Sequence, residues 1–197
     1  MENKIKPNKK LGQNFLINKY TINTILEILD IKKDDHIIEI GPGKGALTDF
    51  ITSKTKNYIG VEKDNNLCDL LNKKYNNNVK IINEDILKID IKELDKKKFR
   101  IVGIDNIHYI SNIHFMMQKE FVDRLISEHG KKTYGRLSVL TQVFFKVEKY
   151  IDIKPNDFYP EPKIFSSFVS LTPLKSCLLK DHETDEFLLF VKEIFNT

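Results

Sequence analysis

Cysteine is scarce in this chain of 197 residues, which contains only Cys68 and Cys177. No CxxC pair occurs and the five histidines are not clustered, so the sequence argues against a disulfide framework and a structural zinc site. No apolar run reaches the roughly 18 residues that a membrane span needs, and no apolar signal segment follows the first charged residues. We therefore expect a soluble, cytoplasmic protein with no metal and no membrane partner.

Arginine is also scarce, because only Arg100, Arg124 and Arg136 occur among the 32 basic residues. Contacts to phosphate would therefore be mostly the point charges of lysine rather than bidentate contacts. The net charge is +4, and residues 1–33 carry seven lysines against three acidic residues, which is the same net excess. Such an arm suits a polyanion such as RNA, and a solvated lysine-rich face is the alternative.

Hydrophobic residues make up 41% of the chain and occur in grouped runs, which suffices for one domain with a full core. Residues 20–31 have the apolar spacing of an amphipathic helix. Short apolar runs at 36–41, 57–64, 79–87 and 99–104 then alternate with helical stretches at 46–54 and 66–75, and residues 92–98 form a solvated turn. Strands that alternate with helices predict a parallel sheet covered on both faces.

This alternation changes after residue 104. Residues 113–119 have the pattern of a fifth strand, yet the segment before them is shorter than the dozen residues that a parallel crossover needs. Either these two strands are not parallel neighbours, or a helix is missing. After a short helix at 120–127, β-rich residues 137–153 and 166–174 flank a proline-rich loop and predict an antiparallel edge. An amphipathic helix is expected at 185–195.

The turn EIGPGKG, residues 39–45, is the first motif that indicates chemistry. Its glycines allow positive φ and a close backbone approach to a ligand at the start of a helix. A dinucleotide fingerprint would read GxGxxG, whereas GxGxG with an acidic residue two positions earlier is common in methyltransferases that bind S-adenosylmethionine. A plain turn between strand and helix is the alternative.

Two carboxylates follow at the ends of the next two predicted strands. Glu62 stands where a carboxylate can accept hydrogen bonds from both ribose hydroxyls of a nucleoside, and Asp85 can accept from an adenine amino group. Each alone is an ordinary surface acid. Together with the glycine turn they mark the sheet edge where open α/β sheets bind ligands.

Seven segments together resemble the ribosomal RNA adenine N6-dimethyltransferases, of the KsgA type that acts on small-subunit rRNA. They are KLGQNFL, EIGPGKGALT, GVEKD, NEDIL, FMMQKEFVDRL, YGRLSVLTQ and FYPEPKIFSS. The macrolide-resistance methyltransferases of large-subunit rRNA share QNFL and the glycine loop, but YGRLSV followed by FYPEPK is more similar to the small-subunit enzymes. The resemblance implies a Rossmann-like class I methyltransferase fold, α/β, with a mostly parallel sheet and an antiparallel edge.

The resemblance also implies roles for single residues. The residues that it assigns to S-adenosylmethionine are Asn14, Leu16, Gly41, Gly43, Glu62, Asp85 and Asn106. The residues that it assigns to catalysis are Asn106, Tyr109 and Phe158. Asn106 would accept a hydrogen bond from the adenine amine, while the aromatic rings hold the base, so that catalysis consists mostly of positioning. For Phe158 the alternative is an aromatic residue of the core.

The catalytic motif departs from the family pattern. The family reads NLPYNIS or NIPYNIS, and this chain reads GIDNIHYISN at residues 103–112. Asn106 and Tyr109 can be placed on the motif, but His108 replaces the proline, the second Asn is absent and the helix that follows in the family is missing. Three explanations stay open: residues omitted from the sequence, a deletion in the chain, or a rebuilt but active region. We expect His108 and His114 to be structural.

The other departure lies after residue 174, where the family continues into a helical domain with a basic helix that grips rRNA. We therefore divide the chain into a methyltransferase domain, residues 1–174, and a remnant or start of a C-terminal helical domain, residues 175–197. The candidates for RNA contact in the loop before residue 137 are His129, Lys131, Lys132 and Arg136. A solvated loop is the alternative there.

The sequence therefore predicts a monomeric enzyme that dimethylates adenine N6 in small-subunit rRNA, on a 30S precursor, during ribosome assembly. A catalytically impaired rRNA-binding assembly factor of the same fold is the alternative from another class. A methyltransferase for another nucleic acid is the third possibility.

Overall fold

The computed structural model describes residues 6–8, 11–76, 79–94, 98–102, 110–174, 179 and 183–195. Its main sheet has seven strands in the order β4-β3-β2-β5-β6-β9-β7, and a separate pair joins β1 to β8. The strands are β1 Phe15–Leu16, β2 Ile37–Ile40, β3 Tyr58–Glu62, β4 Lys80–Asn83, β5 Phe99–Val102, β6 Ile110–Gln118, β7 Phe145–Ile153, β8 Phe158–Tyr159 and β9 Ser166–Pro173.

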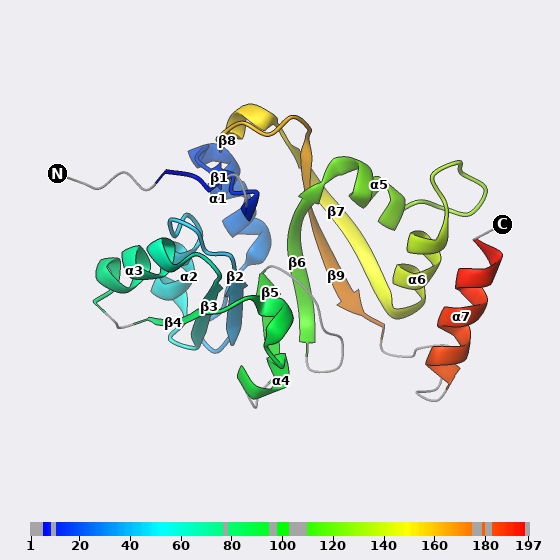
Figure 1. Cartoon of the computed structure of the whole chain (residues 1–197), viewed down its shortest axis with the longest axis horizontal. Coiled ribbons are helices and arrows are strands. Elements are labelled where there is room, and N and C mark those ends of the chain that lie inside the picture. The colour runs from blue at the N-terminus through cyan, green and yellow to red at the C-terminus, as the bar shows by residue number, and fades with distance from the viewer. Residues whose placement is uncertain are drawn as a thin grey trace.

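Helices occupy most of the connections between these strands. They are α1 Lys19–Leu29, α2 Thr48–Lys54, α3 Asn65–Lys74, α4 Ile91–Leu94, α5 Lys119–Leu125, α6 Arg136–Phe144 and α7 Thr184–Ile194, with 3-10 turns at Ile86–Lys88 and Pro155–Asp157. Helices α2 and α3 lie at one end of the molecule, whereas α6 and α7 lie at the other (Figure 1). None of the helices in the described ranges is long and apolar enough to span a bilayer.

The parallel strands are apolar on both faces, as a sheet covered on both sides requires. Successive residues of β2 show the alternation, because Ile37 packs into one core cluster and Ile38 into the other. Both side chains are 1% exposed. The alternation of apolar runs with helical stretches therefore predicts this part of the sheet correctly.

The chain changes direction within the sheet between β2 and β5. From β2 it builds outward through β3 to β4, then returns to pair β5 with the other side of β2, and all of these pairs are parallel. Such a switch point leaves a crevice at the carboxyl ends of the two central strands. The glycine turn begins directly after Ile40, the last residue of β2, and so lies at this edge.

The antiparallel edge predicted from the sequence is present, since β9 pairs antiparallel with both β6 and β7. The prediction of one strand over residues 137–153 is wrong for its first half, because residues Arg136–Phe144 form α6, and correct for its second half, which is β7. Gly135 begins this helix, and its N–H is hydrogen-bonded to the Ser138 hydroxyl. Leu137, Leu140 and Phe144 also recur at helical spacing. Packing therefore overrides the β propensity of the valines and phenylalanine here.

The solvated turn expected at 92–98 is also partly wrong, because it contains the end of the short helix α4.

Strands β5 and β6 are parallel neighbours, with Val102 opposite His114. This excludes the first of the two interpretations of the short connection, that the strands are not paired in parallel. Only residues 103–109 connect the two strands, and they lie outside the described residues. The connection is shorter than parallel crossovers usually are.

Arg100 joins several segments near the amino end of β5. Its guanidinium forms an ion pair with Asp35 at 2.6 Å and donates to the Asn112 side chain at 3.0 Å. A third hydrogen bond reaches the carbonyl of Leu29 at the end of α1. With only 14% of the Arg100 side chain exposed, this network is largely shielded from solvent.

Candidate functional site

The glycine turn packs so closely that two of its positions require glycine. Gly43 has φ +61°, and a Cβ there would lie 3.3 Å from the ring of Phe15. Gly45 has φ +82°, and a Cβ there would lie 2.7 Å from the hydroxyl of Tyr75. At Gly41, with φ +67°, a Cβ would meet nothing within 4 Å, so the turn backbone borders open space at this point.

Glu62 ends β3 and turns its carboxylate toward this turn. One oxygen accepts a hydrogen bond from the N–H of Gly43 at 3.1 Å, and the other accepts from the N–H of Asp64 at 3.0 Å. The residue is 7% exposed. An ionised carboxylate has about four acceptor positions, so each oxygen of Glu62 can still accept a hydrogen bond from a ligand hydroxyl.

Glu39, the acidic residue of the turn motif, is held differently. It is 4% exposed, and a single oxygen of its carboxylate accepts from the hydroxyls of Thr48 and Tyr58, each at 2.7 Å. Burial raises the pKa of Glu39 to about 7, against the lowering effect of these two hydrogen bonds. The site therefore contains a carboxyl group whose protonation changes near neutral pH.

The segment that carries QNFL lies against the turn. Phe15 and Leu16 form β1, which pairs with Tyr159 and Phe158 of β8. The ammonium group of Lys44, in the glycine turn, lies over the Phe15 ring at 4.6 Å from its centroid. Residues far apart in sequence thus meet at one edge of the sheet.

Two adjoining cavities, here together called the glycine-loop cleft, flank this contact. The larger is about 460 Å³ and is lined by Leu11, Gly12, Gln13, Asn14, Gly41, Gly43, Glu62, Lys63 and Leu67. The smaller is about 120 Å³ and is lined by Asn14, Phe15, Leu16, Glu39, Gly41, Pro42, Gly43, Lys44, Ala46, Leu47 and Met116. Small-molecule sites commonly have a volume of roughly 300–1,000 Å³, so the larger cavity has a suitable size for a nucleoside ligand.

The glycine-loop cleft brings together most of the residues predicted to hold the cofactor. Asn14, Gly41, Gly43 and Glu62 line the larger cavity, and Leu16 lines the smaller one. The Asn14 side chain donates to the carbonyl of Gly12 at 2.9 Å. The cleft therefore combines a carboxylate, exposed backbone and an apolar side chain, which is the mixture that a nucleoside with an amino-acid tail requires.

Asp85 lines neither cavity, but it is linked to the larger one. Its carboxylate forms an ion pair at 2.6 Å with Lys63, which lines that cavity, and accepts from the N–H of Leu87 at 3.1 Å. The hydrogen bond from Lys63 is the main reason that the pKa of Asp85 lies below its usual range. In this structure the carboxylate is thus engaged with protein groups.

Phe158 is buried, with 7% of its surface exposed, and packs in the core cluster beside Leu16. In this conformation the ring faces the core, where no base can reach it. The next residue, Tyr159, is 58% exposed. The stacking role of Phe158 stays a prediction. The other two residues predicted to be catalytic, Asn106 and Tyr109, lie outside the described residues.

Sequence reasoning missed Gln13, which lines the larger cavity, and its partner Asp64, which lies next to the lining residue Lys63. The Gln13 amide donates to the Asp64 carboxylate at 2.7 Å. Asp64 also caps α3, because its other oxygen accepts from the N–H of Asn66 at 2.9 Å. An Asp immediately before a helical stretch is a recognised start signal, so the cap was predictable, whereas the partner from the N-terminal segment was not.

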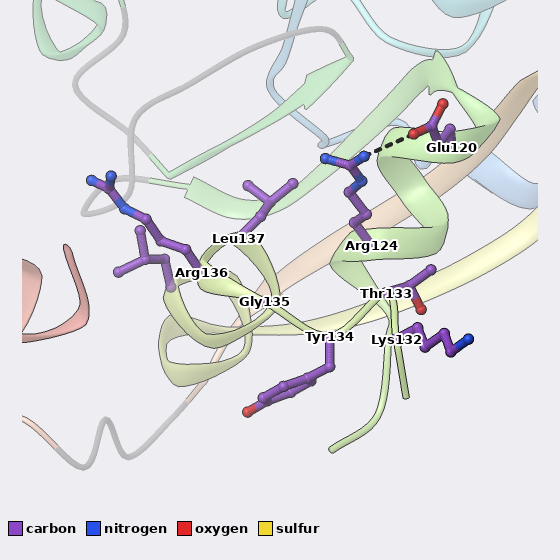
Figure 2. A pocket seen from close by; sticks show the side chains of 9 residues that line it. Glu120, Arg124, Lys132, Thr133, Tyr134, Gly135, Arg136 and Leu137 are labelled. Carbon is purple, nitrogen blue, oxygen red and sulfur yellow. Dashed lines mark hydrogen bonds and ion pairs between the residues drawn. The ribbon is translucent and has the colours of Figure 1, made fainter. Parts of the chain in front are cut away.

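A separate pocket of about 640 Å³ lies between α5 and α6. It is lined by Glu120, Arg124, Lys132, Thr133, Tyr134, Gly135, Arg136, Leu137 and Leu140. Figure 2 shows Arg124 directed toward Glu120, with which it forms an ion pair at 2.8 Å, while Lys132 and Arg136 extend in opposite directions. Of the predicted RNA-contacting residues, Lys132 and Arg136 line this pocket, and His129 and Lys131 do not.

Comparisons with known proteins agree with this geometry. The family model described as "Ribosomal RNA adenine dimethylase" matches residues 4–197. The chain is 40% identical to "Ribosomal RNA small subunit methyltransferase A" of Wigglesworthia glossinidia brevipalpis, over an alignment of 210 residues that covers 97% of this chain and 80% of the relative. Because that alignment is longer than the whole chain of 197 residues, the relative contains segments that this chain lacks.

Two solved structures share the arrangement of elements. A dimethyladenosine transferase from Plasmodium falciparum matches with a TM-score of 0.81 and 25% identity, covering 92% of this chain and 70% of that one. The 23S rRNA methyltransferase ErmE matches with a TM-score of 0.74 and 24% identity, covering 90% of this chain and 77% of that one. The second likeness concerns the fold alone.

Proposed function

We propose, because this chain belongs to the ribosomal RNA adenine dimethylase family, that it transfers methyl groups from S-adenosylmethionine to N6 of adenine in small-subunit ribosomal RNA. The fold is the Rossmann-like fold of class I methyltransferases, with a mostly parallel sheet and an antiparallel edge. The protein is an rRNA adenine N6-dimethyltransferase by family, and S-adenosylmethionine is its cofactor.

The observation that carries this proposal is the placement of Glu62. A buried carboxylate at the carboxyl end of β3, held by two backbone N–H groups and facing a cavity of about 460 Å³, is suited to the two hydroxyls of a ribose. The hydrogen bonds from Gly43 and Asp64 orient the carboxylate before a ligand arrives. A preoriented acceptor loses less entropy on binding than a mobile one.

The other residues of the cleft would hold the rest of the cofactor. Asn14, Leu16, Gly41 and Gly43 would line the bound molecule, and the exposed backbone at Gly41 suits its methionine end. When bound, S-adenosylmethionine supplies an activated methyl group on sulfonium. Asp85 would receive the adenine amino group, which would then compete with Lys63 for the carboxylate.

For the target base we propose that Asn106 accepts from the adenine amine, with Tyr109 and Phe158 as aromatic contacts. Phe158 lies next to the cleft, because it pairs with Leu16, which lines the smaller cavity. Its burial means that it would have to turn outward to stack on a base. Removing a base from its helix costs stacking energy of a few kcal/mol, which an aromatic ring can replace.

The pocket between α5 and α6 is the proposed contact for the rRNA backbone. Strands β2, β5 and β6 are parallel, so the glycine turn after β2 and helix α5 after β6 lie at the same edge of the sheet. Arg124, Lys132 and Arg136 line this pocket, and Glu120 pairs with Arg124 there, so the lining carries a net positive charge. Phosphate contacts of this kind give affinity that depends on salt concentration.

We propose further that the protein works as a cytoplasmic monomer on a precursor of the 30S subunit. Residues 1–174 would form the catalytic domain, and residues 175–197 a remnant or the start of a helical one. Helix α7 contacts α6 through the buried Val191, whereas Leu189 and Phe190 are about 60% exposed. Sedimentation of the purified protein tests the monomer, and a change of mass with concentration would contradict it.

Methyl incorporation tests the function directly. Undermethylated small subunits are incubated with the protein and with S-adenosylmethionine labelled in its methyl group, and N6-dimethyladenine is measured after digestion. We expect incorporation with undermethylated subunits and none with fully methylated subunits, which serve as the control. Subunit binding without any incorporation would instead support the impaired assembly factor. Incorporation into an unrelated nucleic acid but not into subunits would support the third possibility.

A further inference from the structure

Residues 11–16, here called the strap, line the glycine-loop cleft together with the glycine turn, Glu62 and Lys63. Leu11, Gly12, Gln13 and Asn14 all contribute to the larger cavity. The carboxyl end of the strap is held by the pairing of β1 with β8. At its other end the backbone N–H groups of Leu11 and Gln13 donate to the carbonyl of Asn8, and a side chain links this end to Asp64 at the start of α3.

That side chain is Gln13, and both ends of its amide are engaged. The carbonyl oxygen accepts from the N–H of Asn8 at 2.7 Å, and the amide nitrogen donates to the carboxylate of Asp64 at 2.7 Å. A backbone N–H can only donate and a carboxylate can only accept, so these partners fix the orientation of the amide. The glutamine amide supplies both the acceptor and the donor that these partners need.

Asp64 connects the strap to the carboxylate of Glu62. It is 7% exposed, one of its oxygens caps α3 through the N–H of Asn66, and the other receives the Gln13 hydrogen bond. Its own N–H donates to Glu62 at 3.0 Å. The strap, the start of α3 and the proposed ribose acceptor are therefore joined by one continuous set of hydrogen bonds.

We propose that Gln13 is a positioning residue that holds the strap closed along the cleft and thereby slows the release of S-adenosylmethionine. This inference rests on the proposed function of the cleft. The hydrogen bond to Asp64 orders one wall of the site in advance, which lowers the entropy lost when the ligand binds. Release requires the wall to open, so breaking this bond increases the dissociation rate more than it changes the association rate.

Reversing the hydrogen bond tests the proposal. Gln13→Ala removes the donor, and Gln13→Glu places a carboxylate against Asp64, so the second variant is expected to bind more weakly than the first. Asp64→Asn turns an amide nitrogen toward the Gln13 nitrogen and is also expected to weaken binding. When Gln13→Glu and Asp64→Asn are combined, the amide introduced at position 64 donates to the carboxylate introduced at position 13. The cap of α3 is kept in this double variant, and the N–H of Asn8 still has its acceptor.

The measurements are the affinity for S-adenosylmethionine by calorimetry and its dissociation rate by stopped-flow displacement, on the full chain. We expect about a tenfold loss for Gln13→Ala, a larger loss for Gln13→Glu and recovery to within about threefold in the double variant. The matched control is Gln142→Ala, which removes two hydrogen bonds to the carbonyls of Leu125 and Ser127 in α5 and the loop after it. It should lower stability and leave the dissociation rate unchanged.

The outcomes separate this inference from the proposed function. If the unmodified chain does not bind S-adenosylmethionine, the proposed function fails. If it binds and Gln13→Glu releases it at the same rate, the positioning role is overturned and the function stands. If both single variants bind weakly and the double variant does not recover, the hydrogen bond is not what holds the strap, and the inference is again overturned.

Discussion

The glycine-loop cleft and the pocket between α5 and α6 hold their charged groups in opposite ways. In the glycine-loop cleft, Glu39 and Glu62 are at most 7% exposed and each accepts two hydrogen bonds from the protein. In the pocket between α5 and α6, Arg124, Lys132 and Arg136 are exposed. Preoriented buried groups suit a small ligand of fixed shape. Exposed surface cations suit a polyanion, whose contacts add up and are screened by salt.

The largest expected effect is the loss of stability on replacing Phe158, a buried residue that pairs with Leu16 at the smaller cavity. Phe158→Ala should destabilise the protein by about 3–5 kcal/mol, because it removes a buried ring from the core beside Leu16. Denaturant unfolding measures this loss, and Tyr159→Ala, at an exposed neighbour, should cost much less. A cost below about 1 kcal/mol for Phe158→Ala would show that the ring is not held in the core.

Phe158→Leu separates the catalytic role of this residue from its structural one. Leucine keeps most of the buried volume but cannot stack on a base, so we expect methyl transfer to fall while affinity for S-adenosylmethionine stays nearly unchanged. The readouts are single-turnover transfer and calorimetry. A parallel loss of cofactor affinity would place Phe158 in the core or the cofactor pocket alone.

Glu62→Ala tests the preoriented acceptor itself. We expect about a hundredfold weaker binding of S-adenosylmethionine, since hydrogen bonds to a charged group contribute roughly 1.5–3 kcal/mol each. Glu62→Gln, which retains an acceptor but not the charge, should show an intermediate loss in calorimetry. Unchanged affinity in Glu62→Ala would refute the assignment of the ribose to this carboxylate.

Glu39 provides a pH test of the same region. Its pKa is raised to about 7 in the folded protein from an ordinary value of 4.5, so between these values the native state binds more protons than the unfolded state. Stability contributed at this site therefore falls as pH rises from about 4.5 to 7. Glu39→Gln removes the titration, and its stability relative to the unmodified chain should increase by roughly 1–3 kcal/mol between pH 5 and pH 8.

The Glu39→Gln variant must be compared with the unmodified chain at each pH, because the titration of His114 changes stability in the opposite direction. Burial lowers the pKa of His114 to about 4 from 6.5, with a smaller contribution from the charge of Arg100. The native state then binds fewer protons in this window, so stability is lost as pH falls from about 6.5 to 4. The difference between Glu39→Gln and the unmodified chain cancels this effect. A difference that does not vary with pH would contradict the raised pKa of Glu39.

The smallest effects are expected in the pocket between α5 and α6. Lys132→Ala and Arg136→Ala should each weaken binding to small-subunit rRNA by a few fold and should reduce the salt slope of the affinity by about one. Filter binding over a series of salt concentrations measures both. Lys80→Ala, on β4 at the far edge of the sheet, is the control. A loss that is independent of salt would show that this pocket does not contact phosphate.

Much of the fold was predictable because its determinants are local. The parallel strands from β2 to β5 are short apolar runs between helical stretches, and the glycine turn and Glu62 follow strands that the pattern identifies. The helix at residues 137–144 was not predicted, because two valines and one phenylalanine there suit a strand and outweighed the helical spacing of the apolar residues. Packing of α6 against α5 favours the helix. The hydrogen bond from Gln13 to Asp64 joins residues 51 positions apart, and no periodicity reports such a contact.

The hydrogen-bond network of Arg100 predicts which segments of the molecule unfold together. One guanidinium contacts α1, the loop before β2 and strand β6, in addition to its own strand. Arg100 uses three separate nitrogens for these contacts, whereas the three N–H groups of a lysine radiate from one nitrogen and could not reach all three acceptors, so Arg100→Lys would release at least one segment. In hydrogen exchange the four segments should open together as one cooperative unit, whereas the strap, which Gln13 links to Asp64, should exchange earlier. We therefore expect slower exchange at the amino edge of the sheet than in the strap, whose opening admits and releases the ligand.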